Sequence, residues 1–146
     1  MALWFECKAK YEKLQESGVT KVVAEPYLVD ALTFTEAESR FIEELTPGIS
    51  GVFSVSAVKK TRISEIFFND EGDDRFYKVK VNFSQIDERT GSEKKITNFI
   101  LVQASSFDEA YRVFLHGMRG TMADFEIAYI AETPIVDVFP LKLSDG

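Results

Sequence analysis

The sequence predicts an α+β fold made of two tandem copies of a ββαββ unit, with antiparallel sheet, two helices and a pseudo-two-fold relation between the copies. Three observations lead to this prediction: an internal repeat, alternation of apolar and polar residues at the start of each copy, and a well-marked helix start near the middle of each. The repeat comes first, because self-similarity at a fixed period decides how the rest of the chain is divided.

The repeat is clearest where residues 28–41 are laid over residues 101–114. Seven of these 14 positions are identical, whereas about one identity is expected by chance at ordinary residue frequencies. Downstream, residues 53–67 match residues 125–139 at an offset of 72, with four identities and four close substitutions. The chain is therefore interpreted as a tandem duplication.

The first copy is assigned to residues 1–68 and the second to residues 76–143, joined by a linker rich in Asp and Gly at residues 69–75. The chain contains 13 Phe, 5 Tyr and 1 Trp. These rings are too many for two separate cores of about 70 residues each. We therefore expect the two copies to pack as one globular domain with a continuous core or sheet.

The first strand of each copy has the period-two pattern of a half-buried strand. In the first copy its inward residues are Phe5, Cys7, Ala9 and Tyr11. Turns at Gly18 and Gly91 return the chain as a hairpin, and second strands run to Ala31 and Ala104.

The helices begin at two capping boxes, in which a hydroxyl N-cap is followed three residues later by Glu. The N-caps are Thr33 and Ser106, and apolar residues then recur at helical spacing to Leu45 and Met118. A third and a fourth strand follow in each copy. We expect the duplicated phenylalanine rings to be largely buried; they are Phe34, Phe41, Phe53, Phe107, Phe114 and Phe125.

Composition excludes several classes of function. The chain has 17 Lys and Arg against 24 Asp and Glu, a net charge of −7, which disfavours duplex DNA and anionic membranes as partners. No apolar run approaches the roughly 18 residues of a membrane span, and the N-terminus lacks the pattern of a signal peptide. We therefore expect a cytoplasmic protein without a membrane partner.

Candidate catalytic residues are few. Cys7 lies on the inward face of its strand, as expected of a buried structural thiol, and His116 lies at a helix end, where a cation favours the helix dipole. One Cys and one His are too few soft ligands for a structural zinc site. We predict no catalytic residue, no cofactor, no metal and no enzymatic activity.

The polar face of the first strands is the candidate binding surface. Trp4, Lys8 and Lys10 match Phe76, Lys80 and Asn82, and Lys78 replaces a glutamate. Aromatic side chains interleaved with lysines on a strand are typical of sheets that bind single-stranded nucleic acid. The alternative is a half-exposed strand whose lysine stems cover apolar surface, with Trp4 and Phe76 filling a contact between the two copies. The predicted surface, which we expect to be partly exposed on one side of the molecule, comprises Trp4, Lys8, Lys10, Phe76, Lys78 and Lys80.

Five stretches, residues 4–8, 25–31, 34–38, 101–105 and 120–127, resemble an uncharacterised family of small proteins, a domain of unknown function found in Bacteroidetes and some of their phages. The resemblance extends over nearly the whole chain. It implies a bacterial cytosolic protein and supplies no activity.

Two functions remain open. The first is a non-enzymatic interaction or accessory module that acts through a protein partner or self-association. The alternative is a single-stranded nucleic-acid-binding protein that uses the exposed faces of the first strand of each repeat.

Overall fold

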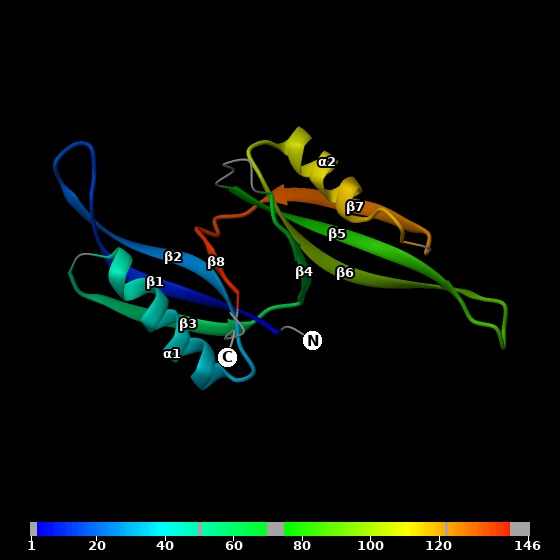
Figure 1. The fold of residues 1–146 in the computed structure, drawn as a ribbon, viewed down its shortest axis with the longest axis horizontal. Helices are drawn as coiled ribbons and strands as arrows, with labels where there is room; N and C mark the ends of the chain where they lie inside the picture. The colour runs from blue at the N-terminus through cyan, green and yellow to red at the C-terminus, as the bar shows by residue number, and fades with distance from the viewer. Residues whose placement is uncertain (1–2, 50, 70–74, 122, 141–146) are drawn as a thin grey trace, which may run out of the picture. The chain divides into compact units, whose positions relative to one another are not determined.

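The computed structural model describes residues 3–49, 51–69, 75–121 and 123–140. The chain divides into two compact units: Met1–Thr61 with Pro134–Gly146, and Arg62–Thr133. Each unit contains a sheet with an α-helix, α1 in the first unit and α2 in the second, as Figure 1 shows. Positions 70–74 of the predicted linker lie outside the described residues.

The first unit is a four-stranded sheet with α1 against one face, in the strand order β3-β1-β2-β8. Its elements are β1 (Trp4–Leu14), β2 (Thr20–Asp30), α1 (Phe34–Leu45), the short 3₁₀ helix η1 (Thr46–Gly48), β3 (Phe53–Lys60) and β8 (Val138–Phe139).

The second unit repeats this arrangement in the order β4-β6-β5-β7, with α2 against one face. Its elements are β4 (Ile63–Phe67), β5 (Arg75–Ile86), β6 (Glu93–Ala104), α2 (Phe107–Gly117) and β7 (Phe125–Glu132). The predicted α+β class and two helices are confirmed. The strands form two sheets, and each sheet is mixed and not purely antiparallel, because β8 runs parallel to β2 and β4 runs parallel to β6.

The fourth strands are exchanged between the sequence repeats. Val138 of β8 lies opposite Leu28 of β2, and Ile66 of β4 lies opposite Leu101 of β6. The last strand of each repeat therefore completes the sheet that the other repeat builds. The compact units consequently differ in their boundaries from the sequence repeats 1–68 and 76–143.

Connection length explains the exchange. In the first unit β2 and β3 both run antiparallel to β1, so a strand parallel to β2 also runs parallel to β3. A crossover between parallel strands of one sheet needs a dozen or more residues. Only Thr61 and Arg62 separate β3 from β4, so β4 cannot return to the open edge of β2.

Matching details recur in the two units. The backbone N–H and the hydroxyl of Thr61 both donate to the Trp4 carbonyl, at 2.9 and 2.8 Å, and Thr133 bonds the Phe76 carbonyl at the same two distances. A β-bulge follows Lys8 in β1 and its counterpart in β5. Two units built alike support the interpretation of a duplication.

The predicted helix caps are confirmed. The hydroxyl of Thr33 accepts the Glu36 N–H at 3.1 Å, and that of Ser106 accepts the Glu109 N–H at 3.2 Å. Thr33 and Ser106 each lie between a strand and the helix that follows it. This satisfies one of the N–H groups that every helix leaves unpaired at its start.

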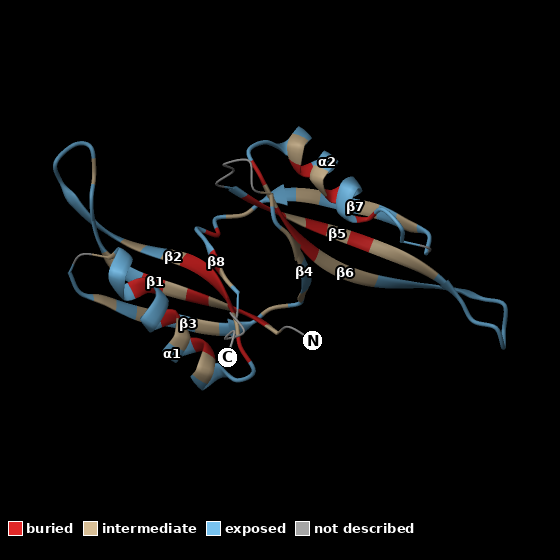
Figure 2. Ribbon diagram, viewed as in Figure 1, coloured by how far each residue is buried: buried red, intermediate tan, exposed pale blue. Residues whose placement is uncertain are grey.

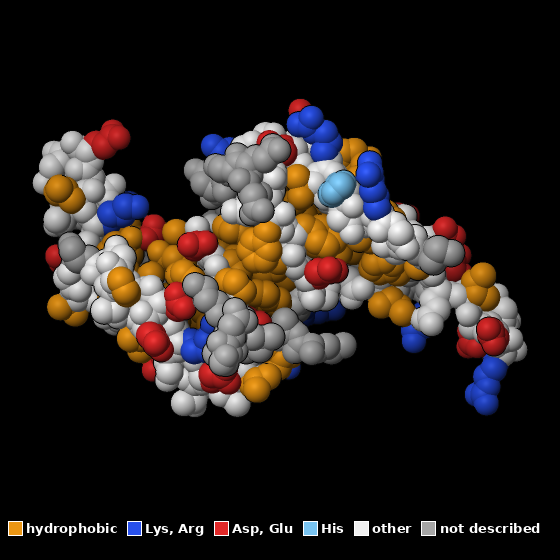
Figure 3. Space-filling view, in the orientation of Figure 1, with side chains coloured by type: hydrophobic (Ala, Val, Ile, Leu, Met, Phe, Trp, Pro, Cys, Tyr) orange, Lys and Arg blue, Asp and Glu red, His pale blue; other side chains and the backbone are white. Residues whose placement is uncertain are grey.

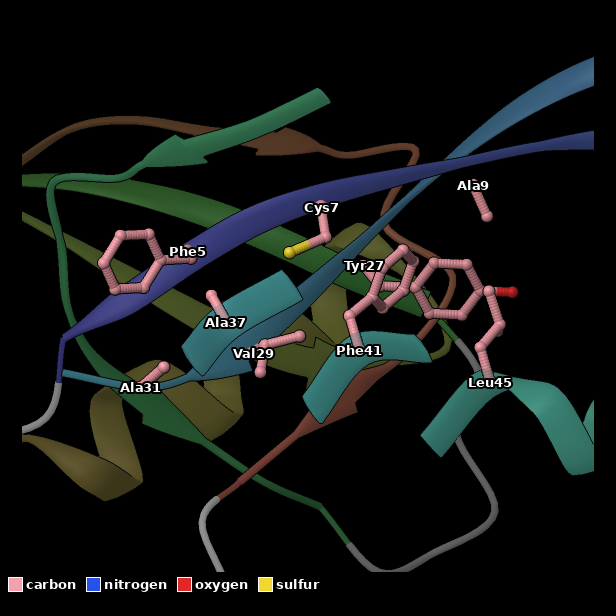
Figure 4. Close-up of a cluster of buried hydrophobic side chains, with 9 residues drawn as sticks. All are labelled: Phe5, Cys7, Ala9, Tyr27, Val29, Ala31, Ala37, Phe41 and Leu45. Carbon is pink, nitrogen blue, oxygen red and sulfur yellow. The ribbon is translucent and has the colours of Figure 1, made fainter. Parts of the chain in front are cut away.

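Each unit has a buried cluster between its sheet and its helix (Figure 2). In the first unit, Figure 4 shows the side chains that form it, from β1, β2, α1 and, at Ala31, the residue that follows β2: Phe5, Cys7, Ala9, Tyr27, Val29, Ala31, Ala37, Phe41 and Leu45. The second cluster comprises Tyr77, Val79, Val81, Ile100, Val102, Ala104, Ala110, Phe114 and Met118.

The six phenylalanines predicted to be buried fall into three classes. Phe41 and Phe114, in the middle of the helices, are fully buried as expected. Phe53 and Phe125, at the start of the third strands, are half-buried. The prediction is wrong for Phe34 and Phe107, which are each 55% exposed. Both are the first residue of their helix, where a side chain points back toward the N-terminus and away from the following turns.

Candidate functional site

Cys7 and His116, the two residues considered for catalysis, lie in a buried cluster and at an exposed helix end. Cys7 is fully buried in the first cluster. Burial, followed by the charges of Glu38 and Glu6, raises the pKa of its thiol to about 11, so it is protonated and unreactive at neutral pH. His116 lies exposed in the last turn of α2, as predicted.

The described residues contain no group of three or more His, Cys, Asp or Glu side chains arranged to hold a metal ion. Among the described helices, none has the length and apolar character needed to cross a membrane.

The aromatic members of the predicted surface are not exposed. Trp4 is 6% exposed and Phe76 is 2% exposed, so the prediction that these rings are partly open to solvent is wrong. They lie on the helix-free faces of their sheets, as the alternation of β1 and β5 indicated. Alternation identifies the face of a strand but not what covers each position along it.

The lysines of the predicted surface remain accessible. Lys8 is half-buried and Lys10 exposed in the first unit, while Lys78 and Lys80 are half-buried in the second. None of the four belongs to the buried clusters under the helices.

The structure brings another aromatic side chain to the lysines of the second unit. Phe99 of β6 lies opposite Lys80 of β5. The Lys78 ammonium and the Arg62 guanidinium each lie 5.2 Å from the centroid of the Phe99 ring, within the range of a cation–π interaction. These four residues, Arg62, Lys78, Lys80 and Phe99, are called the Phe99 cluster below.

Sequence reasoning missed Phe99 and Arg62, because neither belongs to a first strand. Phe99 is recognised only when the register of the β5–β6 hairpin is known, and Arg62 only when β4 is placed beside β6. The alternation of Phe99, Leu101 and Gln103 is a signal that was available, since it assigns Phe99 to the helix-free face.

Among its described residues, the first unit has no equivalent of the Phe99 cluster. By the repeat offsets Phe99 corresponds to Pro26 and Lys78 to Glu6, while Arg62 corresponds to Pro134. Pro26 is buried, and Glu6 forms an ion pair with Lys59 at 3.1 Å. The two lysines predicted here, Lys8 and Lys10, therefore have no aromatic partner of this kind.

A second candidate surface is a groove between α2 and β7, with a volume of about 570 Å³. Helix α2 contributes one stripe of side chains spaced four residues apart: Phe107, Tyr111 and Leu115. Strand β7 contributes Phe125, Ile127, Tyr129 and Ile130. All of these residues are apolar or aromatic, and Figure 3 shows hydrophobic side chains at the surface around α2. We call this surface the α2–β7 groove.

The strand that borders the groove is the last of its sheet. The order β4-β6-β5-β7 leaves the outer edge of β7 without a neighbouring strand among the described residues. An edge strand presents N–H and C=O groups to which an extended chain can bind. The groove and the open edge therefore offer side-chain and backbone contacts to the same ligand.

The first unit has the corresponding groove between α1 and β3, with a volume of about 470 Å³. There Glu38 takes the place of Tyr111, and Ile42 that of Leu115. The first unit's groove thus has a carboxylate where the second has an aromatic ring, so the second is the better apolar site.

Residues 3–141 match the family described as Domain of unknown function (DUF4494), and the chain belongs to this family. No curated protein and no solved structure matches the chain. The family assignment agrees with the resemblance seen in the sequence and brings no activity with it.

Proposed function

We propose that the protein is a non-enzymatic binding module whose α2–β7 groove takes an extended segment of a partner protein. The observation that carries this proposal is the apolar groove beside an open strand edge. The bacterial cytoplasm is the compartment that we propose for it, in line with the family resemblance of the sequence.

The physical basis is β-strand addition. A segment paired with β7 gains main-chain hydrogen bonds, and every second side chain points to the same side of the sheet. The groove lies on the helix side of β7, so those side chains enter it. Its apolar lining selects segments with aliphatic or aromatic residues at alternate positions.

Three side chains of α2 would supply the helix wall of this site. Phe107, Tyr111 and Leu115 are 55, 46 and 39% exposed. Full burial of an exposed large apolar side chain is worth about 1.5–3 kcal/mol, so a ligand that covers one of these half-exposed side chains gains about half of that. Part of that gain offsets the ordering of the segment, which is consistent with a reversible interaction.

The test is selection of peptides from a random library, followed by measurement of their affinity for variants of the full chain. Leu115→Asp should weaken the selected peptides by about tenfold or more, since it places a charge in an apolar site. The matched control is Ile42→Asp, which changes the equivalent helix position of the first unit at nearly equal exposure, 40 against 39%.

Peptides that bind Leu115→Asp as tightly as the parent would exclude the groove. Amide chemical-shift changes of the bound state should include β7, and shifts that avoid β7 would exclude strand addition. Self-association is the other way to cover this surface. It would appear as a concentration-dependent mass that Leu115→Asp abolishes.

A further inference from the structure

We propose that the helix-free face of the second unit's sheet binds single-stranded nucleic acid, with a base stacked on Phe99 and the neighbouring phosphates held by Arg62, Lys78 and Lys80. This site is separate from the α2–β7 groove and does not depend on the function proposed for it. It also differs from the surface predicted from the sequence, because Trp4 and Phe76 take no part and the first unit contributes nothing.

Charge complementarity supports a polyanionic ligand. The whole chain has a net charge of −7, yet two cations lie over the Phe99 ring and a third, Lys80, occupies the position opposite Phe99 on the neighbouring strand. On the same face Lys95 and Glu126 form an ion pair at 3.0 Å, so they largely compensate each other. The Phe99 cluster is therefore a local positive site on an acidic protein, which suits a few phosphates better than a long, densely charged duplex.

The ring supports a ligand that also has flat, stackable groups. Stacking of bases on aromatic side chains is the main source of sequence-tolerant affinity for single strands. In the free protein Arg62 and Lys78 occupy positions over the Phe99 ring at 5.2 Å. A bound base would take one of these positions, and the displaced cation would then be free to bind a phosphate.

Neighbouring groups extend the site across the sheet. Lys80 lies opposite Phe99 of β6. The next pair along β5 and β6 is Asn82 and Thr97, joined by a hydrogen bond of 2.7 Å. The face thus presents aromatic, cationic and hydrogen-bonding groups in adjacent rows, as sheet-type modules for single-stranded RNA do.

The experiment is a fluorescence-anisotropy titration of labelled oligo(dT) and oligo(U) with the full chain at low and moderate salt. We expect binding that weakens as salt rises, with a log–log slope of about −2, since about 0.7 counterions are released for each of three phosphates. The variant carrying Arg62→Glu, Lys78→Glu and Lys80→Glu should lose binding.

The repeat provides a control of equal charge change. A variant with Lys8→Glu, Lys10→Glu and Lys60→Glu alters three lysines of the first unit and should bind like the parent. Phe99→Leu keeps an apolar side chain while removing the ring, and should weaken binding by about tenfold. Lys78→Gln with Lys80→Gln tests the cations with a milder change, and circular dichroism of each variant reports its folding.

Four results would overturn the proposal. They are absence of binding by the parent at low salt, equal losses in the first-unit control and the second-unit variant, full binding by Phe99→Leu, and equal competition by duplex DNA or heparin. The last would mean that the cluster accepts any polyanion without using its ring. Leu115→Asp in the groove should leave oligonucleotide binding unchanged, so this proposal and the proposed function can fail separately.

Discussion

Exchange of the fourth strands predicts which phenylalanines are energetically coupled. The ring of Phe67 on β4 lies 6.2 Å from that of Phe114 on α2, and the ring of Phe139 on β8 lies 6.5 Å from that of Phe41 on α1. Each pair joins rings from different sequence repeats. Without exchange, the pairs would be Phe67 with Phe41 and Phe139 with Phe114.

The magnitudes follow from burial and geometry. Phe41 and Phe114 are fully buried, so replacing either with Ala should lower the free energy of unfolding by about 3–5 kcal/mol. An aromatic pair at these centroid distances is worth about 0.5–1.5 kcal/mol beyond its buried area. We therefore expect a coupling free energy of about 1 kcal/mol for each observed pair. The two pairs expected without exchange, called the crossed pairs, join rings of different clusters. The losses of unfolding free energy in their two single variants should therefore add to within about 0.5 kcal/mol.

The assay is urea unfolding of the parent, the four Phe→Ala single variants and the four double variants. Far-UV circular dichroism follows both units, and fluorescence of Trp4, the only tryptophan, follows the first unit. Phe34→Ala is the control for truncation of a ring at an exposed position, and should cost much less than Phe41→Ala. Coupling that is larger in the crossed pairs than in the observed ones would refute the exchange.

Two further predictions concern a glycine and the cysteine. A Cβ at Gly117 would lie 2.5 Å from the ring of Phe67, whereas one at Gly48 meets no atom within 4 Å. Gly117→Ala should therefore destabilise the fold by about 1–2 kcal/mol and Gly48→Ala by less than about 0.5; equal urea midpoints would contradict this. Burial raises the pKa of the Cys7 thiol from 9.0 to about 11, so the unfolded chain ionises first. The stability linked to this group is complete below pH 9 and is lost as the pH rises toward 11. Cys7→Ala should reduce the loss of unfolding free energy at alkaline pH. If the pH dependence of unfolding free energy is the same in Cys7→Ala as in the parent, or if the thiol of the folded parent is labelled rapidly at pH 8, the thiol is accessible.

The elements of this fold were predictable where a local signal defines them. Thr33 and Ser106 each precede a glutamate by three residues, and both cap a helix. Period-two alternation likewise marked β1 and β5. The parallel pairing of β4 with β6 and of β8 with β2 was not predictable, because a short apolar run identifies a strand and not its neighbour. The exchange depends on connection lengths and strand directions, which become visible only in the assembled sheets.

The candidate site was predictable in part for the same reason. Alternation assigned Lys78 and Lys80 to the polar face of β5, and the structure keeps them accessible. It also assigned Phe76 to that face, but the ring is buried. The aromatic partner of the lysines, Phe99, comes from a strand about 20 residues later in the chain. Cross-strand pairs of this kind are set by register, which sequence periodicity does not specify.

The two units differ in ways that bear on where binding occurs. Both keep the threonine that bonds the first-strand carbonyl, the bulge in the first strand and the hydroxyl helix cap, so these features suffice to build the fold twice. The pairs Pro26/Phe99, Glu6/Lys78 and Glu38/Tyr111 occupy equivalent positions and differ in chemistry. The fold tolerates either member of each pair, so these differences are not required for folding. Each places an aromatic or cationic side chain in the second unit, on the Phe99 cluster or in the α2–β7 groove. The asymmetry is the one expected if the second unit binds ligands, as proposed above, and the first unit is a scaffold of the same construction.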